Sequence, residues 1–339
     1  MSRVFVTRRI PEAGLHTLRE GGAEARVGQP DDEREVERST LLEGAAWCDV
    51  LLPLLTETVD REVLTANPGL RGVANYAVGY DNVDVEAATR LGIPVSNTPG
   101  VLTETTADLT WALLLAAARR IVEADAYMRA GRYSLWGPNL MLGADVSPGG
   151  SGRRKVLGIV GFGRIGEAVA RRASGFDMDV LVHDPYHRER VEAFGPPPAR
   201  WVELDELVES SDFLTLHPPL TEETRHMIGE AELRRMKASS YLINVSRGPV
   251  VDERALVRAL REEWIAGAAL DVYEDEPEMA PGLAERDNAV LVPHVGSASR
   301  DTRERMAVMA ATNALHHLRG ERAPDAVNPG VYEGDAWRA

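Results

Sequence analysis

The sequence predicts an α/β protein with two Rossmann-like, doubly wound parallel-sheet domains and a cleft between them. Two observations carry this prediction. Short apolar segments alternate with helix-length amphipathic segments along most of the chain, which is the pattern of βαβ units. The chain also has 339 residues, more than one hydrophobic core usually organises, so about two domains are expected.

The first part of the chain contains four predicted strands and one early helix. The helix is predicted over 12–20, directly after Pro11. The strands cover residues 3–7, 50–55, 72–77 and 93–96. Because helix-length segments separate these strands, we expect them to form a mainly parallel sheet.

A long helix is predicted over 103–120, with Thr103 as its N-cap. Its centre, 111–118, is apolar on nearly every face. We therefore expect this helix to be buried all round, either between domains or against a second subunit.

A second set of strands follows a Gly- and Pro-rich loop over 143–154, which includes Ser151. Six strands of this kind match a doubly wound sheet of Rossmann type. They cover residues 156–160, 179–183, 213–217, 241–245, 268–272 and 290–292. A final amphipathic helix over 300–319 is expected to pack back onto the first domain.

The composition narrows the class of protein. With 44% hydrophobic and 27% charged residues the chain is expected to be globular and soluble. The formal charge of -15 repels phosphate backbones, so no nucleic-acid partner is expected. The N-terminus shows no signal peptide, and no apolar stretch is long enough to cross a membrane. The single cysteine, Cys48, is consistent with a reducing compartment, and a cytoplasmic location is expected.

The sequence shows no metal-binding motif of the H-E-x-x-H or C-x-x-C type, so no metal site is predicted. His183 and His217 each end a predicted strand and are expected to be structural. His316 and His317 are expected to lie on the surface of the last helix.

The strongest local signal is a strand that leads into G-x-G-x-x-G and then into a helix. In this motif Gly161 permits a tight turn, Gly163 lets the backbone approach a pyrophosphate, and Gly166 lets helix and strand pack closely. The backbone N–H groups at the helix N-terminus, around Arg164 and Ile165, would then face the phosphate charge. The motif therefore predicts a dinucleotide-binding site.

An acid at the end of the next strand bears on the choice of dinucleotide. Asp184 follows Gly166 by 18 residues, where a carboxylate can accept hydrogen bonds from the adenosine ribose. It would repel a 2′-phosphate, so NAD is favoured over NADP. The alternative is that Asp184 only caps a turn with Pro185.

Two later segments place reactive side chains just beyond strands, at the edge of the sheet where ligands bind. Arg247 follows one strand, and an arginine there can grip a carboxylate with two hydrogen bonds. His294 follows another strand and, with an acidic partner, would form a general acid–base pair. The residues alone leave Glu274, Asp275 and Glu276 open as that partner.

In this order and spacing, these segments resemble the D-isomer-specific 2-hydroxyacid dehydrogenase family. The similarity extends from about residue 50 to 328. Within the family the sequence looks most similar to glyoxylate and hydroxypyruvate reductases, on the segments 75–84, 97–103, 106–115 and 293–298.

The resemblance implies roles for individual residues. Arg247 would bind the substrate carboxylate and polarise its keto group, and His294 would protonate the carbonyl oxygen as hydride arrives from the nicotinamide. It selects Glu276 as the carboxylate that pairs with this histidine. Further substrate contacts are implied for Leu54, Val78 and Gly79.

The same resemblance implies a set of cofactor contacts and an assembly state. The contacts are Thr106, Gly161, Gly163, Arg164, Ile165, Gly166, Asp184, Pro218, Pro219, Thr224, Val245, Ser246, Arg247, Asp271, His294 and Gly296. The apolar helix over 109–118 and the following loop with Trp136 would form a homodimer interface. Residues 1–102 and 298–339 would form the substrate domain, and 103–297 the dinucleotide-binding domain.

The implied activity is NAD(H)-dependent reduction of a short 2-keto acid, such as glyoxylate or hydroxypyruvate, to the D-2-hydroxy acid. Two alternatives stay open. One is another family substrate such as D-3-phosphoglycerate, although the chain ends soon after the last predicted helix, without the regulatory domain common in those enzymes. The other is an NAD-sensing scaffold similar to the C-terminal-binding-protein corepressors, although no peptide-binding tail or low-complexity extension appears.

Overall fold

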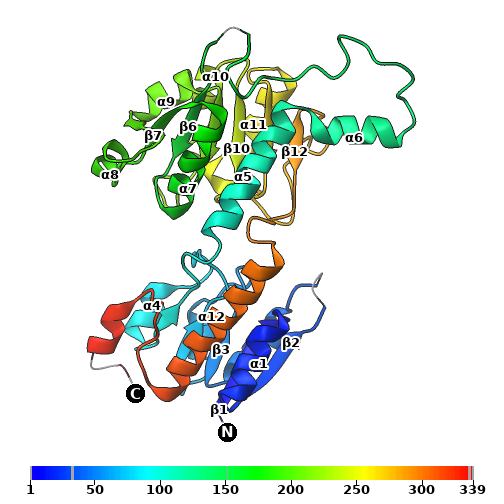
Figure 1. The fold of residues 1–339 in the computed structure, drawn as a ribbon. Helices are drawn as coiled ribbons and strands as arrows, with labels where there is room; N and C mark the ends of the chain where they lie inside the picture. Colours follow the sequence, from blue (N-terminus) through cyan, green and yellow to red (C-terminus); the bar gives the residue numbers. More distant parts are fainter. Residues whose placement is uncertain (1, 32–33, 151, 335–336, 338–339) are drawn as a thin grey trace. The chain divides into compact units, whose positions relative to one another are not determined.

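A computed structural model describes residues 2–31, 34–150, 152–334 and 337. The chain divides into two compact units, one made of Met1–Leu102 with Ser297–Ala339 and the other of Thr103–Gly296. Each unit contains one parallel sheet with its own helices (Figure 1). The prediction of two parallel-sheet α/β regions is therefore confirmed. Residues 1 and 339, at the ends of the predicted substrate domain, and Ser151 of the predicted loop lie outside the described residues.

The first unit holds a five-stranded sheet in the order β2-β1-β3-β4-β5, with every neighbouring pair parallel. Its strands are β1 (Ser2–Arg8), β2 (Ala23–Gln29), β3 (Val50–Leu52), β4 (Gly72–Ala74) and β5 (Val95–Ser96). The sequence predicted all of these except β2. That strand lies at the sheet edge and is half exposed, so charged residues such as Glu24 and Arg26 interrupt its apolar pattern.

Helices cover both faces of this sheet. They are α1 (Glu12–Glu20), α2 (Arg38–Trp47), α3 (Arg61–Thr65), α4 (Val85–Arg90) and α12 (Arg300–Arg319), followed by a 3₁₀ turn over Pro329–Glu333. On one face α12 packs against α1, β3 and β4. The other face carries a second apolar cluster under α2, α3 and α4, which includes the buried Cys48. Burial raises the pKa of the Cys48 thiol to about 12, so this cysteine acts as a packing residue.

The expected surface position of His317 is wrong. Only 2% of this residue is exposed, because α12 is covered by α1 on one side and by strands on another. The imidazole lies against Gly72, where an added Cβ would come within 2.5 Å of its ring. Its Nε2 lies 2.9 Å from Ser96 Oγ. The neighbouring His316 is partly exposed and pairs with Glu321.

The second unit holds a seven-stranded parallel sheet in the order β12-β11-β10-β9-β6-β7-β8. The strands are β6 (Val156–Val160), β7 (Asp179–His183), β8 (Ala199–Trp201), β9 (Phe213–Leu216), β10 (Tyr241–Asn244), β11 (Gly267–Leu270) and β12 (Ala289–Leu291). The sequence predicted six of these. It missed β8, which has three residues at the edge of the sheet and no continuous apolar run.

The helices of this unit are α5 (Thr103–Ala118), α6 (Ile121–Arg129), α7 (Arg164–Arg172), α8 (Arg188–Glu192), α9 (Leu204–Ser210), α10 (Glu230–Arg235) and α11 (Glu253–Arg261). Two short 3₁₀ turns, Ala173–Phe176 and Gly248–Val250, complete the regular structure. Apolar clusters line both faces of the sheet, so its central strands are buried on both sides.

Two expectations for the long helix need correction. The helix ends at Ala118, and Arg120 has a left-handed backbone with φ of 52°, so the chain turns before α6 begins. Trp111 and Leu114 are buried within the unit, whereas Ala112 is exposed. The buried side of the helix packs on α7 and on β10 and β11. Burial of the remaining faces against another domain or a second subunit stays a prediction. Thr103 is the first helical residue rather than a cap outside the helix.

The segment after α5 extends away from the sheet of its unit. Figure 1 shows α6 and the following loop leading outward before the chain returns to β6. Several large apolar side chains are exposed there, among them Leu135 at 80% and Trp136 at 72%. In the part of the chain that the structure describes, no helix is both long and apolar enough to span a membrane.

Parallel strands all end at the same edge of a sheet, and this brings distant segments of the second unit together. The segments after β6, β9, β10, β11 and β12 carry Gly161, Pro218, Arg247, Asp271 and His294 respectively. Ligands of doubly wound sheets bind at this carboxyl edge.

Burial of His317 predicts a pH dependence of stability. Burial lowers its pKa in the folded protein to about 3, whereas an exposed histidine titrates near 6.5. Between these values the unfolded chain binds a proton that the folded chain does not, so stability falls as pH drops from about 6.5 towards 3. One such proton contributes a slope of about 1.4 kcal/mol per pH unit.

We expect His317→Gln to flatten this slope. The measurement is the free energy of unfolding by urea at pH values from 4.5 to 8, for the wild type and the variant, with circular dichroism to verify that both are folded at pH 8. Equal slopes in the two proteins would contradict the assignment.

Candidate active site

The glycine motif forms a tight turn between β6 and α7. Gly161 has φ of 84°, and an added Cβ would come within 2.8 Å of the Pro218 nitrogen. At Gly166 a Cβ would lie 2.1 Å from the Gly161 oxygen, so helix and turn touch there. Gly163 is different, because nothing lies within 4 Å of its Cβ position. The first and third glycines are thus required by packing, and the middle one faces open space.

The N-terminus of α7 has the chemistry of an anion site. Gly163 is its N-cap, and the amides of Arg164, Ile165 and Gly166 have no acceptor among the described residues. Three unpaired N–H groups with the positive end of the helix dipole suit a pyrophosphate. The residues present therefore fit a dinucleotide.

Asp184 is buried beside this turn, and its carboxylate accepts hydrogen bonds from neighbouring residues of the protein. One oxygen accepts hydrogen bonds from the amides of Tyr186 and His187, and the other from the amide of Phe162 and the His187 ring. Burial raises the pKa of Asp184, but the hydrogen bonds from Phe162, His187 and Tyr186 outweigh it and hold the pKa below its ordinary value. The carboxylate is thus ionised and caps the turn after β7, which does not decide between the two interpretations of Asp184. Ribose binding stays a prediction.

His294 and Glu276 form a hydrogen-bonded pair. His294 Nδ1 lies 2.9 Å from Glu276 Oε2, and both side chains are partly exposed. The other Glu276 oxygen accepts the amide of Tyr273 at 3.0 Å. Burial raises the pKa of Glu276, but the bond and charge of His294, the Tyr273 amide and the charge of Arg247 together hold it below its ordinary value. Of the three acids that the residues left open, this one contacts the histidine.

The backbone of His294 is held in a strained conformation. Its φ is 51°, which is uncommon for a residue with a side chain. Asp271 supplies the restraint. Its carbonyl accepts the His294 amide, and its carboxylate oxygens accept the amides of Val295 and Gly296 at 2.6 and 2.8 Å. Burial raises the pKa of Asp271 in spite of these bonds. Asp271 therefore positions the histidine.

Arg247 follows β10 in a turn that is organised by Asn244. The Asn244 amide donates to the Arg247 carbonyl, and its oxygen accepts from the amide and hydroxyl of Ser246. The next residue, Gly248, packs directly on the Tyr273 backbone, because an added Cβ would lie 1.7 Å from that carbonyl oxygen. The arginine segment and the Glu276 segment are thus in contact.

The other predicted cofactor residues lie around the same edge. The Thr106 hydroxyl donates to the Gly296 carbonyl at 3.1 Å, and this links α5 to the histidine segment. Thr224 closes its own loop by donating to the Pro219 carbonyl at 2.7 Å. This loop begins at Pro218, whose backbone nitrogen lies against Gly161. Val245, the residue between Asn244 and Ser246 in the chain, is buried.

Three predicted substrate residues lie in the first unit. Leu54 is partly buried against the apolar cluster below β1 and β3. The carbonyls of Val78 and Gly79 accept the side-chain amides of Asn97 and Asn75. Neither of their own N–H groups has an acceptor among the described residues. These two amides are available to an anion.

Three positioning features were not predicted from the sequence: Asn244, the Tyr273 amide and the buried carboxylate of Glu253. An asparagine at a strand end is a typical turn residue, and this signal could have found Asn244. The Tyr273 amide donates to the Glu276 side chain, three residues further on. The Glu253 carboxylate accepts amides that lie 21 and 27 residues further on. No sequence pattern marks these bonds.

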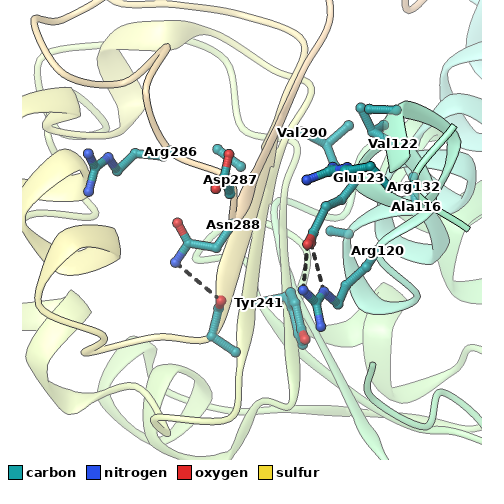
Figure 2. Close-up of a pocket in the computed structure, with 14 residues that line it drawn as sticks. Ala116, Arg120, Val122, Glu123, Arg132, Tyr241, Arg286, Asp287, Asn288 and Val290 are labelled. Carbon is teal, nitrogen blue, oxygen red and sulfur yellow. Dashed lines mark hydrogen bonds and ion pairs between the residues drawn. The ribbon is translucent and has the colours of Figure 1, made fainter. Parts of the chain in front are cut away.

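A pocket of the second unit lies elsewhere. It has a volume of about 680 Å³ and is lined by α5, α6, β10 and the segment before β12. Figure 2 shows Arg120 paired with Glu123 beside Tyr241 in this pocket. None of the predicted site residues lines it. No group of three or more His, Cys, Asp or Glu side chains in the described ranges could hold a metal ion.

Comparison with known proteins defines the class. Residues 111–296 match the family model described as "D-isomer specific 2-hydroxyacid dehydrogenase, NAD binding domain". The chain belongs to this family and is an oxidoreductase that acts on keto and hydroxy acids with a nicotinamide dinucleotide. The family resemblance and the enzyme class that the sequence predicted are confirmed.

Individual relatives share nearly the full length. A glyoxylate reductase of Korarchaeum cryptofilum is 53% identical over 97% of this chain and 96% of its own. A Thermus thermophilus protein of known structure is 44% identical with a TM-score of 0.87, over 96% of this chain and 99% of its own.

An NADPH-dependent glyoxylate/hydroxypyruvate reductase of Sinorhizobium meliloti, solved with NADP and malonate, is 31% identical with a TM-score of 0.81, over 97% of both chains. These similarities do not favour the scaffold and D-3-phosphoglycerate alternatives.

Proposed function

We propose that this protein reduces glyoxylate or hydroxypyruvate to the corresponding 2-hydroxy acid, with NADH as the preferred reductant. The observation that carries the proposal is the His294–Glu276 pair with Arg247 in the adjoining segment, at the edge that also holds the anion-binding turn. The similarity to glyoxylate reductases supports the substrate class.

The chemistry follows from the charges that develop. A 2-keto acid carries a carboxylate, which the Arg247 guanidinium can bind with two hydrogen bonds. A bound reduced nicotinamide supplies the hydride that adds to the keto carbon. His294 Nδ1 is held by Glu276, so Nε2 is the nitrogen that gives its proton to the carbonyl oxygen. Glu276 stays ionised and stabilises the imidazolium before that transfer.

Each unit has a proposed role. Residues 1–102 with 298–339 form the substrate domain, where the unpaired amides of Val78 and Gly79 bind the substrate carboxylate beside Leu54. Residues 103–297 form the dinucleotide-binding domain, supported by the free amides at the start of α7. We propose the cytoplasm as its location, consistent with the single buried cysteine.

The first test is NADH consumption with purified protein and a panel of glyoxylate, hydroxypyruvate, pyruvate and larger keto acids. We expect turnover with a short keto acid. We expect His294→Gln to lower kcat by roughly 10²- to 10⁴-fold with NADH binding retained. Arg247→Ala should raise KM for the keto acid and lower kcat.

The matched control for Arg247→Ala is Arg188→Ala, which removes an exposed cation from the same unit. NADH binding with no turnover of any keto acid would contradict the proposal. So would normal kinetics in both site variants.

The Asp184 carboxylate is the basis for the proposed preference for NAD. Its buried negative charge would repel the 2′-phosphate of NADP. We expect the wild-type protein to bind NADH more tightly than NADPH. Asp184→Asn should lower the ratio of the NADPH Kd to the NADH Kd roughly ten-fold or more. The measurement is cofactor fluorescence titration of both dinucleotides. Tighter NADPH binding by the wild type would contradict it, and a melting curve shows whether the variant keeps its fold.

A homodimer is proposed from the apolar surface of the segment after α5. Met128, Leu135, Trp136 and Leu142 are each more than half exposed, on a segment that leads away from its own sheet. We expect a dimer mass in analytical ultracentrifugation, and a shift towards monomer in the variant Leu135→Ser with Trp136→Ser. The matched control is Tyr186→Ser, which removes an aromatic side chain that is 85% exposed elsewhere. A monomeric wild type would overturn the proposal.

A further inference from the structure

We infer that Glu253 is a positioning residue for this reaction: its buried carboxylate holds both ends of the segment that carries Glu276. The inference rests on the proposed function, because it assigns a role relative to the His294–Glu276 pair. Glu253 is the first residue of α11 and is only 4% exposed. It contacts neither His294 nor Glu276 through a side-chain bond among the described residues.

The contacts of the Glu253 carboxylate lie on either side of Glu276 in the chain. One oxygen accepts the Glu274 amide and the other accepts the Ala280 amide, both at 2.7 Å. Between these points the chain makes a tight turn, with the Glu278 amide donating to the Asp275 carbonyl at 2.9 Å. One carboxylate thus binds both ends of a short loop, and Glu276 is one of the residues of that loop.

A second set of bonds ties the same loop to the arginine segment. Glu274 Oε1 lies 2.6 Å from His226 Nε2, and the His226 amide donates to the Pro249 carbonyl at 2.7 Å. Glu274 also accepts the Glu253 amide at 3.4 Å. Because Pro249 lies two residues after Arg247, this network connects the loop of Glu276 to the segment of the substrate-binding arginine.

The chemistry requires a carboxylate at this position. The two backbone donors lie at different oxygens of the side chain, and a carboxylate provides an acceptor at both positions. Its negative charge is also favourable at the N-terminus of a helix. A glutamine offers one oxygen and one NH₂ group, so it leaves one buried N–H without an acceptor. One end of the loop would then be released, and Glu276 would no longer be held in line with His294 Nδ1.

The test compares Glu253→Gln with Glu230→Gln. Both residues are the first residue of a helix, but Glu230 begins α10 and pairs with Arg234 and Arg258 rather than with the loop. In the free enzyme, we expect Glu253→Gln to speed amide hydrogen exchange over residues 273–280 and Glu230→Gln to leave it unchanged. In steady state with glyoxylate and NADH, Glu253→Gln should lower kcat roughly ten- to hundred-fold, with KM changed less than about three-fold.

A double-mutant cycle separates positioning from a general loss of structure. If Glu253 acts through Glu276, then adding Glu253→Gln to Glu276→Gln lowers kcat by less than about two-fold further. A full, additive loss in the double variant would overturn the inference, as would wild-type kcat in Glu253→Gln. Unchanged exchange over 273–280 would overturn it even where the proposed function holds.

Absence of wild-type turnover would instead reject the proposed function, and the exchange measurement would still report whether Glu253 holds the loop. A melting curve for each variant identifies one that fails to fold, and Glu253→Asp then provides a milder change at the same position.

Discussion

Buried carboxylates that accept backbone N–H groups determine the geometry of the reactive edge. Asp271 fixes the histidine segment through the amides of Val295 and Gly296. Glu253 fixes the loop of Glu276. In a low-dielectric interior each charge-assisted bond is strong, and an unpaired amide would be costly. The acid–base pair is thus positioned by two buried carboxyl groups that need not touch the substrate.

This arrangement divides the acids of the site by environment. Asp271 has a raised pKa because burial dominates, whereas Glu276 has a lowered pKa because its cationic neighbours and the Tyr273 amide outweigh burial. The acid with the lowered pKa is the one that contacts the histidine. A carboxylate that stays ionised is what a proton-donating imidazole requires beside it.

Much of this could be predicted from the sequence, and the failures have physical causes. The glycine turn was identifiable because its glycines follow a fixed spacing between a strand and a helix, and packing requires the first and the third of them. Two edge strands, β2 and β8, were not predicted, because half-exposed strands carry charged or mixed residues that hide the apolar pattern of a strand. His317 was misplaced because helical periodicity does not reveal that a helix is covered on two sides. The hydrogen bonds between Glu253 and its loop could not be predicted, because acids are common at helix N-termini without any such contact.

The position of α12 has a consequence for how the chain is made. This helix packs against α1, β3 and β4, and His317 fills the space above Gly72, so residues 300–319 complete a core whose other parts lie before residue 102. The continuous segment 103–296 can form its own core as soon as it leaves the ribosome. The first unit must wait for contacts across more than 200 residues, such as the bond from Asn313 to the Asn97 carbonyl. The inserted unit is therefore the first to be complete, and the unit that begins the chain is the last.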